Sequence, residues 1–125
     1  LVARAKGARP VLVDVLAEAG ANVTEVELYC VETPSVDPLA LARVRGAEID
    51  VVTLGSPSAA VGLHSMLDGD LSPLADALVA SIGPATTAAA QELGFAVGVE
   101  AAEHTFAGLA RAVREHFETA VHNIQ

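Results

Sequence analysis

The chain has 125 residues and a formal net charge of −9, and 52% of its residues are hydrophobic although only 3% are aromatic. This length predicts one domain whose core is built from Ala, Val and Leu. The negative charge argues against nucleic-acid binding, because no basic stripe is present to neutralise phosphates. The sequence also lacks a membrane-spanning apolar run and the pattern of a signal peptide. We therefore expect a cytoplasmic protein without membrane or nucleic-acid partners.

The single cysteine and the first residues limit the chemistry and the extent of the chain. Cys30 has no second cysteine to pair with, and no group of residues has the spacing of metal ligands. A reactive thiolate is not expected at Cys30, since its neighbours are acidic. Residues 1–4 read as the interior of a strand, with no Met and no polar lead-in. We expect the chain to be a fragment.

Strands and helices are expected to alternate along the chain. Pro10 fits the first turn of a helix that Gly20 ends, and Thr105 fits the N-cap of the last helix. The expected order is strand 1–4, helix 10–19, strand 23–30, helix 38–45, strand 49–54, helix 58–67, a short helical piece 74–77, strand 78–82, helix 84–93, strand 95–99, and helix 105–117 with a frayed tail to 125.

This alternation predicts an α/β fold, a doubly wound parallel sheet with helices on both faces. We expect one α/β unit over residues 1–125. Pro34 and Pro38 make residues 31–38 the best candidate for an internal boundary, across which residues 1–30 could swap onto another copy.

Two stretches place small and hydroxyl residues where an apolar strand ends and a helix begins. They are residues 54–61 and 81–86. In an open α/β sheet ligands bind at this edge, and free N–H groups at helix starts attract carboxylates or phosphates. The same residues are also ordinary N-caps of helices that bind nothing. Five residues each follow a predicted strand and open a helix, so we expect them to cluster along one edge of the sheet: Ser56, Ser58, Gly83, Pro84 and Thr105.

Tyr29 closes a strand directly before the proline-containing segment. Its phenol could pack at the strand end with the hydroxyl in water, or donate a proton to a leaving oxygen in a cleft. The spacing alone favours packing. Ser56 and Ser58 lack the elbow sequence of a nucleophilic serine. The histidines are interpreted as surface or helix residues without a catalytic role: His64, His104, His116 and His122.

The order of several motifs resembles one enzyme family. Val26-Glu27-Leu28-Tyr29 precedes a proline-containing linker, and three further motifs follow. They resemble the C-terminal half of uroporphyrinogen III synthase, a cofactor-free enzyme of tetrapyrrole synthesis, and imply a flavodoxin-like half of a two-domain enzyme. These motifs are Gly55-Ser56-Pro57-Ser58-Ala59-Ala60-Val61, Ile82-Gly83-Pro84-Ala85-Thr86 and Ala102-Glu103-His104-Thr105-Phe106-Ala107-Gly108-Leu109.

The resemblance implies a substrate, hydroxymethylbilane, a linear tetrapyrrole rich in carboxylates. The family closes it to uroporphyrinogen III with inversion of the last pyrrole ring and loss of water. Tyr29 matches the tyrosine thought to assist the leaving hydroxyl, and Gly55 departs from the family, which often has Ser or Thr there. The residues that match substrate-binding positions are Ser56, Ser58, Gly83, Pro84, Thr86 and Thr105.

The same resemblance implies that only half of the two-domain enzyme is present in this sequence. The family chain crosses twice between its domains, so residues 1–28 would lack their native sheet partners. They could fold onto residues 49–99 of the same chain, or swap onto a second copy to form a dimer. A reading from a different class is a non-catalytic α/β module that binds a small anion or a partner protein, because this fold serves many functions.

Overall fold

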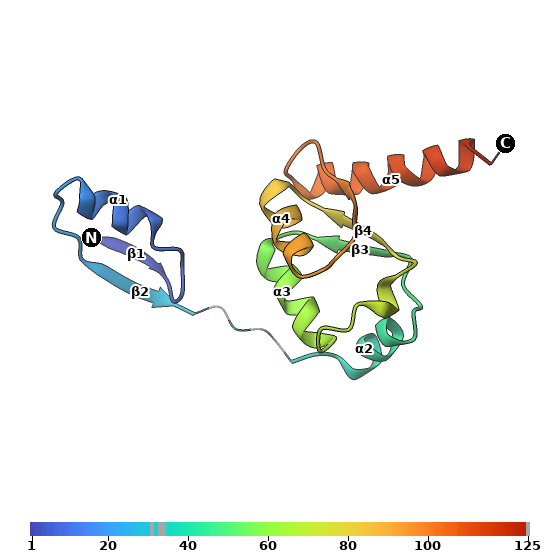
Figure 1. Cartoon of the computed structure of the whole chain (residues 1–125), viewed down its shortest axis with the longest axis horizontal. Coiled ribbons are helices and arrows are strands. Elements are labelled where there is room, and N and C mark those ends of the chain that lie inside the picture. The colour runs from blue at the N-terminus through green and yellow to red at the C-terminus, as the bar shows by residue number, and fades with distance from the viewer. Residues whose placement is uncertain (31, 33–34, 125) are drawn as a thin grey trace. The chain divides into compact units, whose positions relative to one another are not determined.

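The computed structural model describes residues 1–30, 32 and 35–124 (Figure 1). The chain divides into two compact units, Leu1–Ser35 and Val36–Gln125. We call them unit 1 and unit 2 and describe each by itself. Within the boundary expected at 31–38, residues 31, 33 and 34 lie outside the described residues.

Unit 1 is a strand–helix–strand motif. β1 (Val2–Ala5) leads into α1 (Val11–Glu18), and β2 (Glu25–Tyr29) returns parallel to β1, with Val2 paired to Glu25. Parallel neighbours need such a crossover, and a helix is the usual form. Gly20 has a φ of +84° after α1, a conformation that favours glycine, so the helix ends where the sequence predicts.

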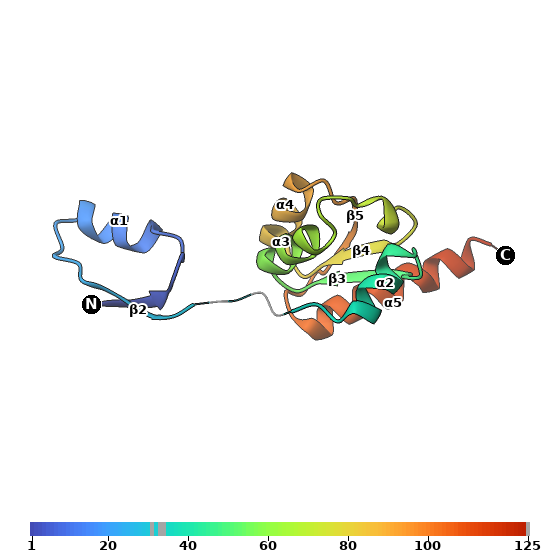
Figure 2. The same cartoon turned by 90° about the horizontal axis from the view of Figure 1, so that it is seen from below.

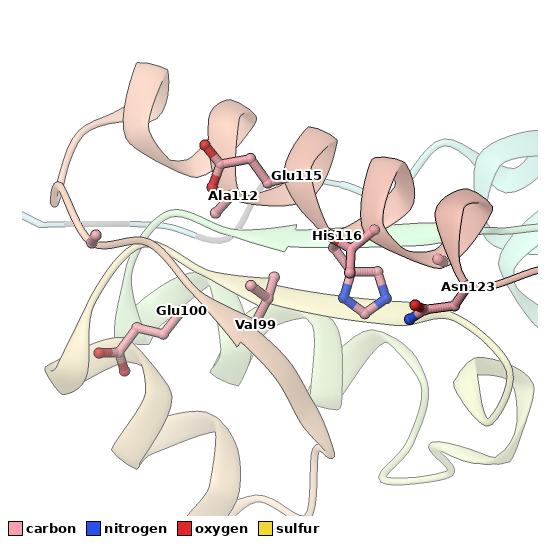
Figure 3. A pocket seen from close by; sticks show the side chains of 9 residues that line it. Val99, Glu100, Ala112, Glu115, His116 and Asn123 are labelled. Atoms are coloured by element: carbon pink, nitrogen blue, oxygen red, sulfur yellow. The ribbon is translucent and has the colours of Figure 1, made fainter.

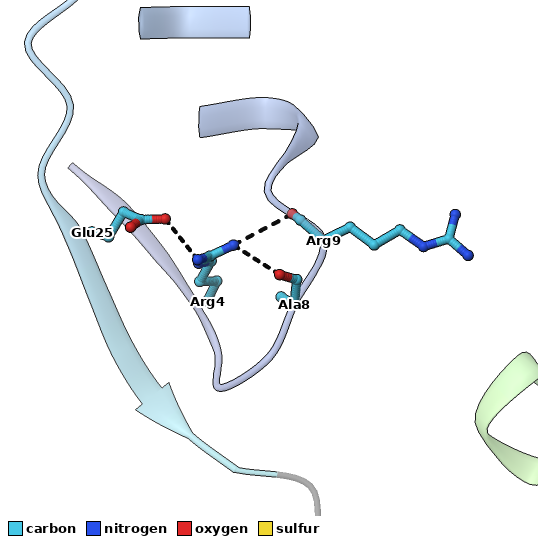
Figure 4. A network of polar contacts seen from close by, with 4 residues as sticks. All are labelled: Arg4, Ala8, Arg9 and Glu25. Carbon is cyan, nitrogen blue, oxygen red and sulfur yellow. Dashed lines mark hydrogen bonds and ion pairs between the residues drawn. The ribbon is translucent and has the colours of Figure 1, made fainter. Parts of the chain in front are cut away.

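Arg4 joins the parts of unit 1 (Figure 4). Its guanidinium forms an ion pair with Glu25 on β2, with Nη2 and Oε1 2.8 Å apart. It also donates to the backbone carbonyl oxygen of Ala8, in the loop before α1, at 2.9 Å. One half-buried side chain thus connects both strands and the loop between β1 and α1.

Unit 1 leaves most of its apolar side chains uncovered. None of its described residues is buried, and Val11, Leu12 and Val15 of α1 are 62%, 58% and 56% exposed. An α/β layer is stable when its apolar faces are packed against further elements. Two strands and one helix do not provide that cover.

Unit 2 contains a parallel sheet, and its strands pair in the order β3-β4-β5 in the described part of the chain. No described helix has both the length and the apolar character needed to cross a bilayer. The elements in chain order are α2 (Pro38–Arg45), β3 (Val51–Leu54), α3 (Pro57–Met66), the 3₁₀ turn η1 (Ser72–Leu74), β4 (Leu78–Ser81), α4 (Pro84–Glu92), β5 (Val97–Glu100) and α5 (Phe106–His122).

The sheet of unit 2 is covered on both faces. Successive side chains of a strand point to opposite sides, so Val79 and Ala80 of β4 belong to different cores. Val79 packs with residues of α3 and α4, and Ala80 packs with Leu109 of α5. Figure 2 shows α3 and α4 on one side of the sheet and α5 on the other. The predicted α/β fold with parallel strands and helices on both faces is confirmed.

Several predicted element limits are wrong. The last helix does not fray after Phe117 but continues to His122, since no Gly or Pro interrupts it. The short helical turn is not at 74–77 but at 72–74, where Pro73 fits its start. The last strand starts at Val97 rather than Phe95, because the backbone N–H of Phe95 still bonds a carbonyl of α4. The second strand starts at Glu25 rather than at 23.

Candidate functional site

The three strands of unit 2 end at the same edge of the sheet. Leu54, the last residue of β3, pairs with Ser81 at the end of β4, and Ser81 pairs with Glu100 at the end of β5. The segments that follow these strands therefore lie side by side. We call this edge, formed by residues 55–58, 82–86 and 101–106, the carboxyl edge. It is the side of a parallel sheet at which α/β proteins bind ligands.

Ser56 and Ser58 lie at the start of α3. Ser56 is the N-cap, and its Oγ accepts a hydrogen bond from the backbone N–H of Ala59 at 3.1 Å. The Oγ atoms of Ser56 and Ser58 are 3.0 Å apart and share a hydrogen bond. Since only one hydroxyl proton is used between them, the other remains able to donate to an anion. The capping role and a binding role are therefore compatible.

The start of α4 has no side-chain cap. Gly83 is the N-cap residue and is buried, whereas Pro84 at the first helical position is exposed. A helix without a side-chain cap leaves first-turn N–H groups available for an anion. Thr86 is only 3% exposed. Its side chain faces the interior, so the structure does not bring it to the open surface of the carboxyl edge.

Thr105 caps α5 at the third segment of this edge. Its Oγ1 accepts a hydrogen bond from the backbone N–H of Gly108 at 3.0 Å. The turn is tight, because a Cβ on Gly108 would lie 2.1 Å from the carbonyl oxygen of Glu103. A glycine at 108 therefore lets the chain enter α5 with Thr105 at the edge.

Two aromatic side chains of the third segment lie against glycines of the first and second segments. A Cβ on Gly83 would lie 3.1 Å from Cγ and Cδ2 of His104. A Cβ on Gly55 would lie 2.8 Å from Cε1 of Phe106. The rings occupy the space that side chains at 55 and 83 would need. The structure thus brings five of the predicted residues to one edge, namely Ser56, Ser58, Gly83, Pro84 and Thr105.

A chain of polar contacts lies beneath this edge. Ser81 is 0% exposed, and its Oγ shares a hydrogen bond with Oγ1 of Thr87 in α4. The Thr87 hydroxyl also donates to Oε2 of Glu100 at 2.5 Å. Figure 3 shows Val99 turned toward α5 and Glu100 turned away from it. No local sequence pattern predicts this network, because Thr87, which carries it, has no motif of its own one position after Thr86.

Tyr29 belongs to unit 1. It ends β2, its side chain is 62% exposed, and its carbonyl oxygen accepts a hydrogen bond from the backbone N–H of Lys6 at 2.8 Å. The backbone is therefore fixed while the phenol is open to solvent. Tyr29 thus lies in unit 1, whereas the carboxyl edge belongs to unit 2.

A groove of about 460 Å³ between β5 and α5 is a different feature of unit 2 (Figure 3). Glu100, Glu115 and His116 line it together with small and apolar residues. Its lining includes the carboxylate of Glu115 and no Lys or Arg, which disfavours an anionic ligand there. Among the described residues, no group of three or more His, Cys, Asp or Glu is placed to hold a metal ion.

Asp70 lies at the opposite edge of the sheet, in the turn before η1. Hydrogen bonds from the side chain and the backbone of Ser72 lower the pKa of its carboxyl group, and the charge of Arg45 adds to this effect. This acid therefore stabilises a turn and is remote from the carboxyl edge.

Comparison with known proteins decides the family. Residues 1–111 match the family described as uroporphyrinogen-III synthase HemD. The chain belongs to this family. A uroporphyrinogen-III synthase of Synechococcus elongatus (strain ATCC 33912 / PCC 7942 / FACHB-805) is 31% identical to it over an alignment that covers 87% of this chain and 44% of the relative. The chain therefore spans less than half the length of that relative.

Membership of the uroporphyrinogen-III synthase family confirms the resemblance drawn from the ordered motifs. The match includes both units, so it covers Tyr29 as well as the carboxyl edge. The two aromatic residues of the third segment, His104 and Phe106, were not among the predicted site residues. Their contacts join positions more than twenty residues apart, and no local pattern reports such pairs.

Proposed function

We propose that this chain is the C-terminal part of a uroporphyrinogen III synthase. The whole enzyme closes hydroxymethylbilane to uroporphyrinogen III, with inversion of the last pyrrole ring and loss of water, and needs no cofactor. The observation that carries the proposal is the carboxyl edge of unit 2, together with the family match over residues 1–111. We place this reaction in the cytoplasm, where an exposed free thiol such as that of Cys30 stays reduced.

The carboxyl edge suits a ligand with many carboxylates although the chain is acidic. Three helices start there, and the positive end of each helix dipole faces the edge. Ser56, Ser58 and Thr105 add hydroxyls that can donate, and α4 adds N–H groups without a side-chain cap. Backbone and hydroxyl donors bind carboxylates without basic side chains. We assign the backbone N–H groups of Gly83 and of the first turn that contains Thr86 to binding of a substrate carboxylate, and Pro84, which has no N–H, to contact with the substrate through its exposed ring.

We assign Tyr29 to the departure of the hydroxyl group. Loss of water requires a proton at the leaving oxygen, and a phenol hydroxyl can supply a proton or a hydrogen bond there. The exposed phenol of Tyr29, at the end of a strand whose backbone is paired, is free to do so.

We further propose that another polypeptide segment packs against unit 1 and completes its fold. Its apolar helix face is exposed, and its two strands have no further strand beside them in the described residues. The completing chain is an N-terminal half of the same protein or, by a domain swap, a second copy of this chain. Size measurement by light scattering on the natural protein separates these cases: a monomer indicates the first and a dimer the second.

The reaction is tested with the natural protein that carries this chain. Hydroxymethylbilane is supplied, the products are oxidised, and the type I and type III porphyrin isomers are separated. The expected result is type III product well above the type I product that forms spontaneously. A folded protein that yields only type I overturns the proposal and favours the non-catalytic α/β module, whose binding of carboxylated tetrapyrroles is measured in the same preparation.

A further inference from the structure

The segment between β5 and α5 places two aromatic side chains on the carboxyl edge. His104 lies against Gly83 and Phe106 against Gly55, the loops that follow the neighbouring strands β4 and β3. Adjacent strands are about 4.8 Å apart, so the two rings cover neighbouring loops. Thr105, between them, caps α5 and fixes the backbone of the segment.

Both rings remain open to solvent in spite of these contacts. His104 is exposed and Phe106 is 74% exposed. A single exposed apolar side chain is common on protein surfaces. The position of Phe106 is more specific, because this first residue of α5 follows the cap Thr105 and lies against Gly55, directly before the cap Ser56 of α3. A flat apolar surface is thus surrounded by donors for anions.

The acidic side chains near this edge are engaged within the chain, which leaves His104 able to donate a hydrogen bond to an anion. Glu103 forms an ion pair with Arg111 at 3.3 Å, and Glu100 accepts the hydrogen bond of Thr87. Both acids next to the segment are therefore engaged within the chain. In the part of the chain that the structure describes, no ion pair includes His104.

The other arginines of unit 2 form ion pairs within the chain, Arg114 with Glu118 on α5 itself. Arg43 pairs with Glu48, and Arg45 pairs with Asp68. Asp68 follows α3, at the end of the sheet where the strands begin. Cationic side chains at that end do not reach the carboxyl edge, whereas an imidazole N–H at 104 does.

We infer that His104 and Phe106 contact the substrate, His104 through one of its carboxylates and Phe106 through the face of a pyrrole ring. This inference rests on the proposed function and adds a specificity element to it. An imidazole has an N–H donor in either protonation state, and its hydrogen bond to a carboxylate is charge-assisted. An aromatic ring packs against another through offset or edge contacts. Together the two side chains bind a carboxylate and a pyrrole ring, the two features of a carboxylated tetrapyrrole.

The experiment uses the natural protein and steady-state kinetics with hydroxymethylbilane. His104→Ala and Phe106→Ala are each expected to raise KM about tenfold, the loss of one good contact, with kcat within about twofold. His104→Gln keeps an N–H donor and Phe106→Tyr keeps the ring, so each should recover most of the loss. His122→Ala, an exposed histidine at the end of α5, is the matched control and should leave both constants unchanged.

Direct binding separates the inference from the proposed function. Uroporphyrin, the oxidised macrocycle with the same carboxylates and four pyrroles, is titrated by fluorescence against each variant. Absence of type III product from the wild type overturns the function, but weaker uroporphyrin binding by His104→Ala and Phe106→Ala still supports the contacts. Unchanged KM and unchanged uroporphyrin affinity in both variants overturn the inference while type III formation stands. A wild type that neither forms type III nor binds uroporphyrin overturns both.

Discussion

The ring of His104 occupies the space of a side chain at Gly83: a Cβ built there would lie 3.1 Å from Cγ and Cδ2 of the imidazole. The backbone of Gly83 is extended, with φ 176°, so any residue could adopt it. A glycine at 83 is therefore explained by this neighbour rather than by backbone strain. The relationship links the loop after β4 to the loop after β5.

Gly83→Ala should act through His104. The exposed imidazole can move aside by a few tenths of an ångström, so we expect the free energy of unfolding to fall by less than about 1 kcal/mol. KM should nevertheless rise as it does in His104→Ala, because the ring is displaced from its place on the loop. Kinetics and urea unfolding of the natural protein measure the two effects. In the double variant the effects on KM should not add, whereas full additivity would contradict the coupling.

The sequence predicts the parts of the site that depend on local signals. Ser56 and Thr105 are hydroxyl residues directly before a helix, and both cap in the structure. The pairs Gly83–His104 and Gly55–Phe106 depend on tertiary packing, so periodicity and capping rules give no sign of them. The direction of the Thr86 side chain also could not be predicted from the sequence. The rotation of α4 turns its side chain inward, while the next residue, Thr87, carries the polar contacts.

Gly108 and Gly62 should respond oppositely to alanine. A Cβ at 108 would lie 2.1 Å from the backbone oxygen of Glu103, so the chain must shift, and we expect Gly108→Ala to cost at least about 1–3 kcal/mol. Gly62 lies inside α3, and apart from the adjoining backbone of that helix a built Cβ has no neighbour within 4 Å. Gly62→Ala should stabilise by about 0.5–1 kcal/mol, since glycine disfavours a helix interior. Urea unfolding measures both. A neutral Gly108→Ala would contradict a tight turn between Glu103 and Gly108.

Thr87→Val should destabilise unit 2. The substitution keeps the side-chain shape but removes the hydroxyl between buried Ser81 and Glu100, and we expect a cost of about 1–3 kcal/mol in unfolding free energy. Thr53→Val, at an exposed threonine of β3, is the matched control and should change little.

A double variant tests whether Thr87 acts through Ser81. Ser81→Ala removes the buried hydroxyl that Thr87→Val leaves without its partner, so the two costs together should be smaller than their sum. Equal costs for Thr87→Val and Thr53→Val would contradict the network.

Unit 1 and unit 2 should differ in their ability to fold alone. A peptide of residues 1–35 has two strands and no buried described residue, which is too little for independent stability. Its circular dichroism is expected to show an unfolded chain. Residues 36–125, with cores on both faces of the sheet, should unfold cooperatively in urea. A cooperative transition in the 1–35 peptide would remove the reason to seek completing chain for unit 1.

The 125-residue chain alone should not form type III product at a useful rate. Closing a flexible tetrapyrrole requires that both of its ends be held together, and this positioning supplies much of the reduction in the barrier. The carboxyl edge of one unit binds only part of such a ligand. The isomer assay on the chain as a monomer checks this expectation, and strong type III formation would contradict it.

Tyr29→Phe in the natural protein is the test of the phenol. If the hydroxyl assists the departing group, kcat should fall by about ten- to a hundredfold, at the low end of general-acid contributions. The melting temperature should stay close to the wild-type value, because the ring is kept and the phenol is 62% exposed. A tyrosine that only packs would leave kcat close to the wild-type value as well, because phenylalanine keeps the ring. Since both quantities come from one variant, an unchanged kcat removes Tyr29 from the catalytic assignment and leaves the carboxyl edge as a binding site alone.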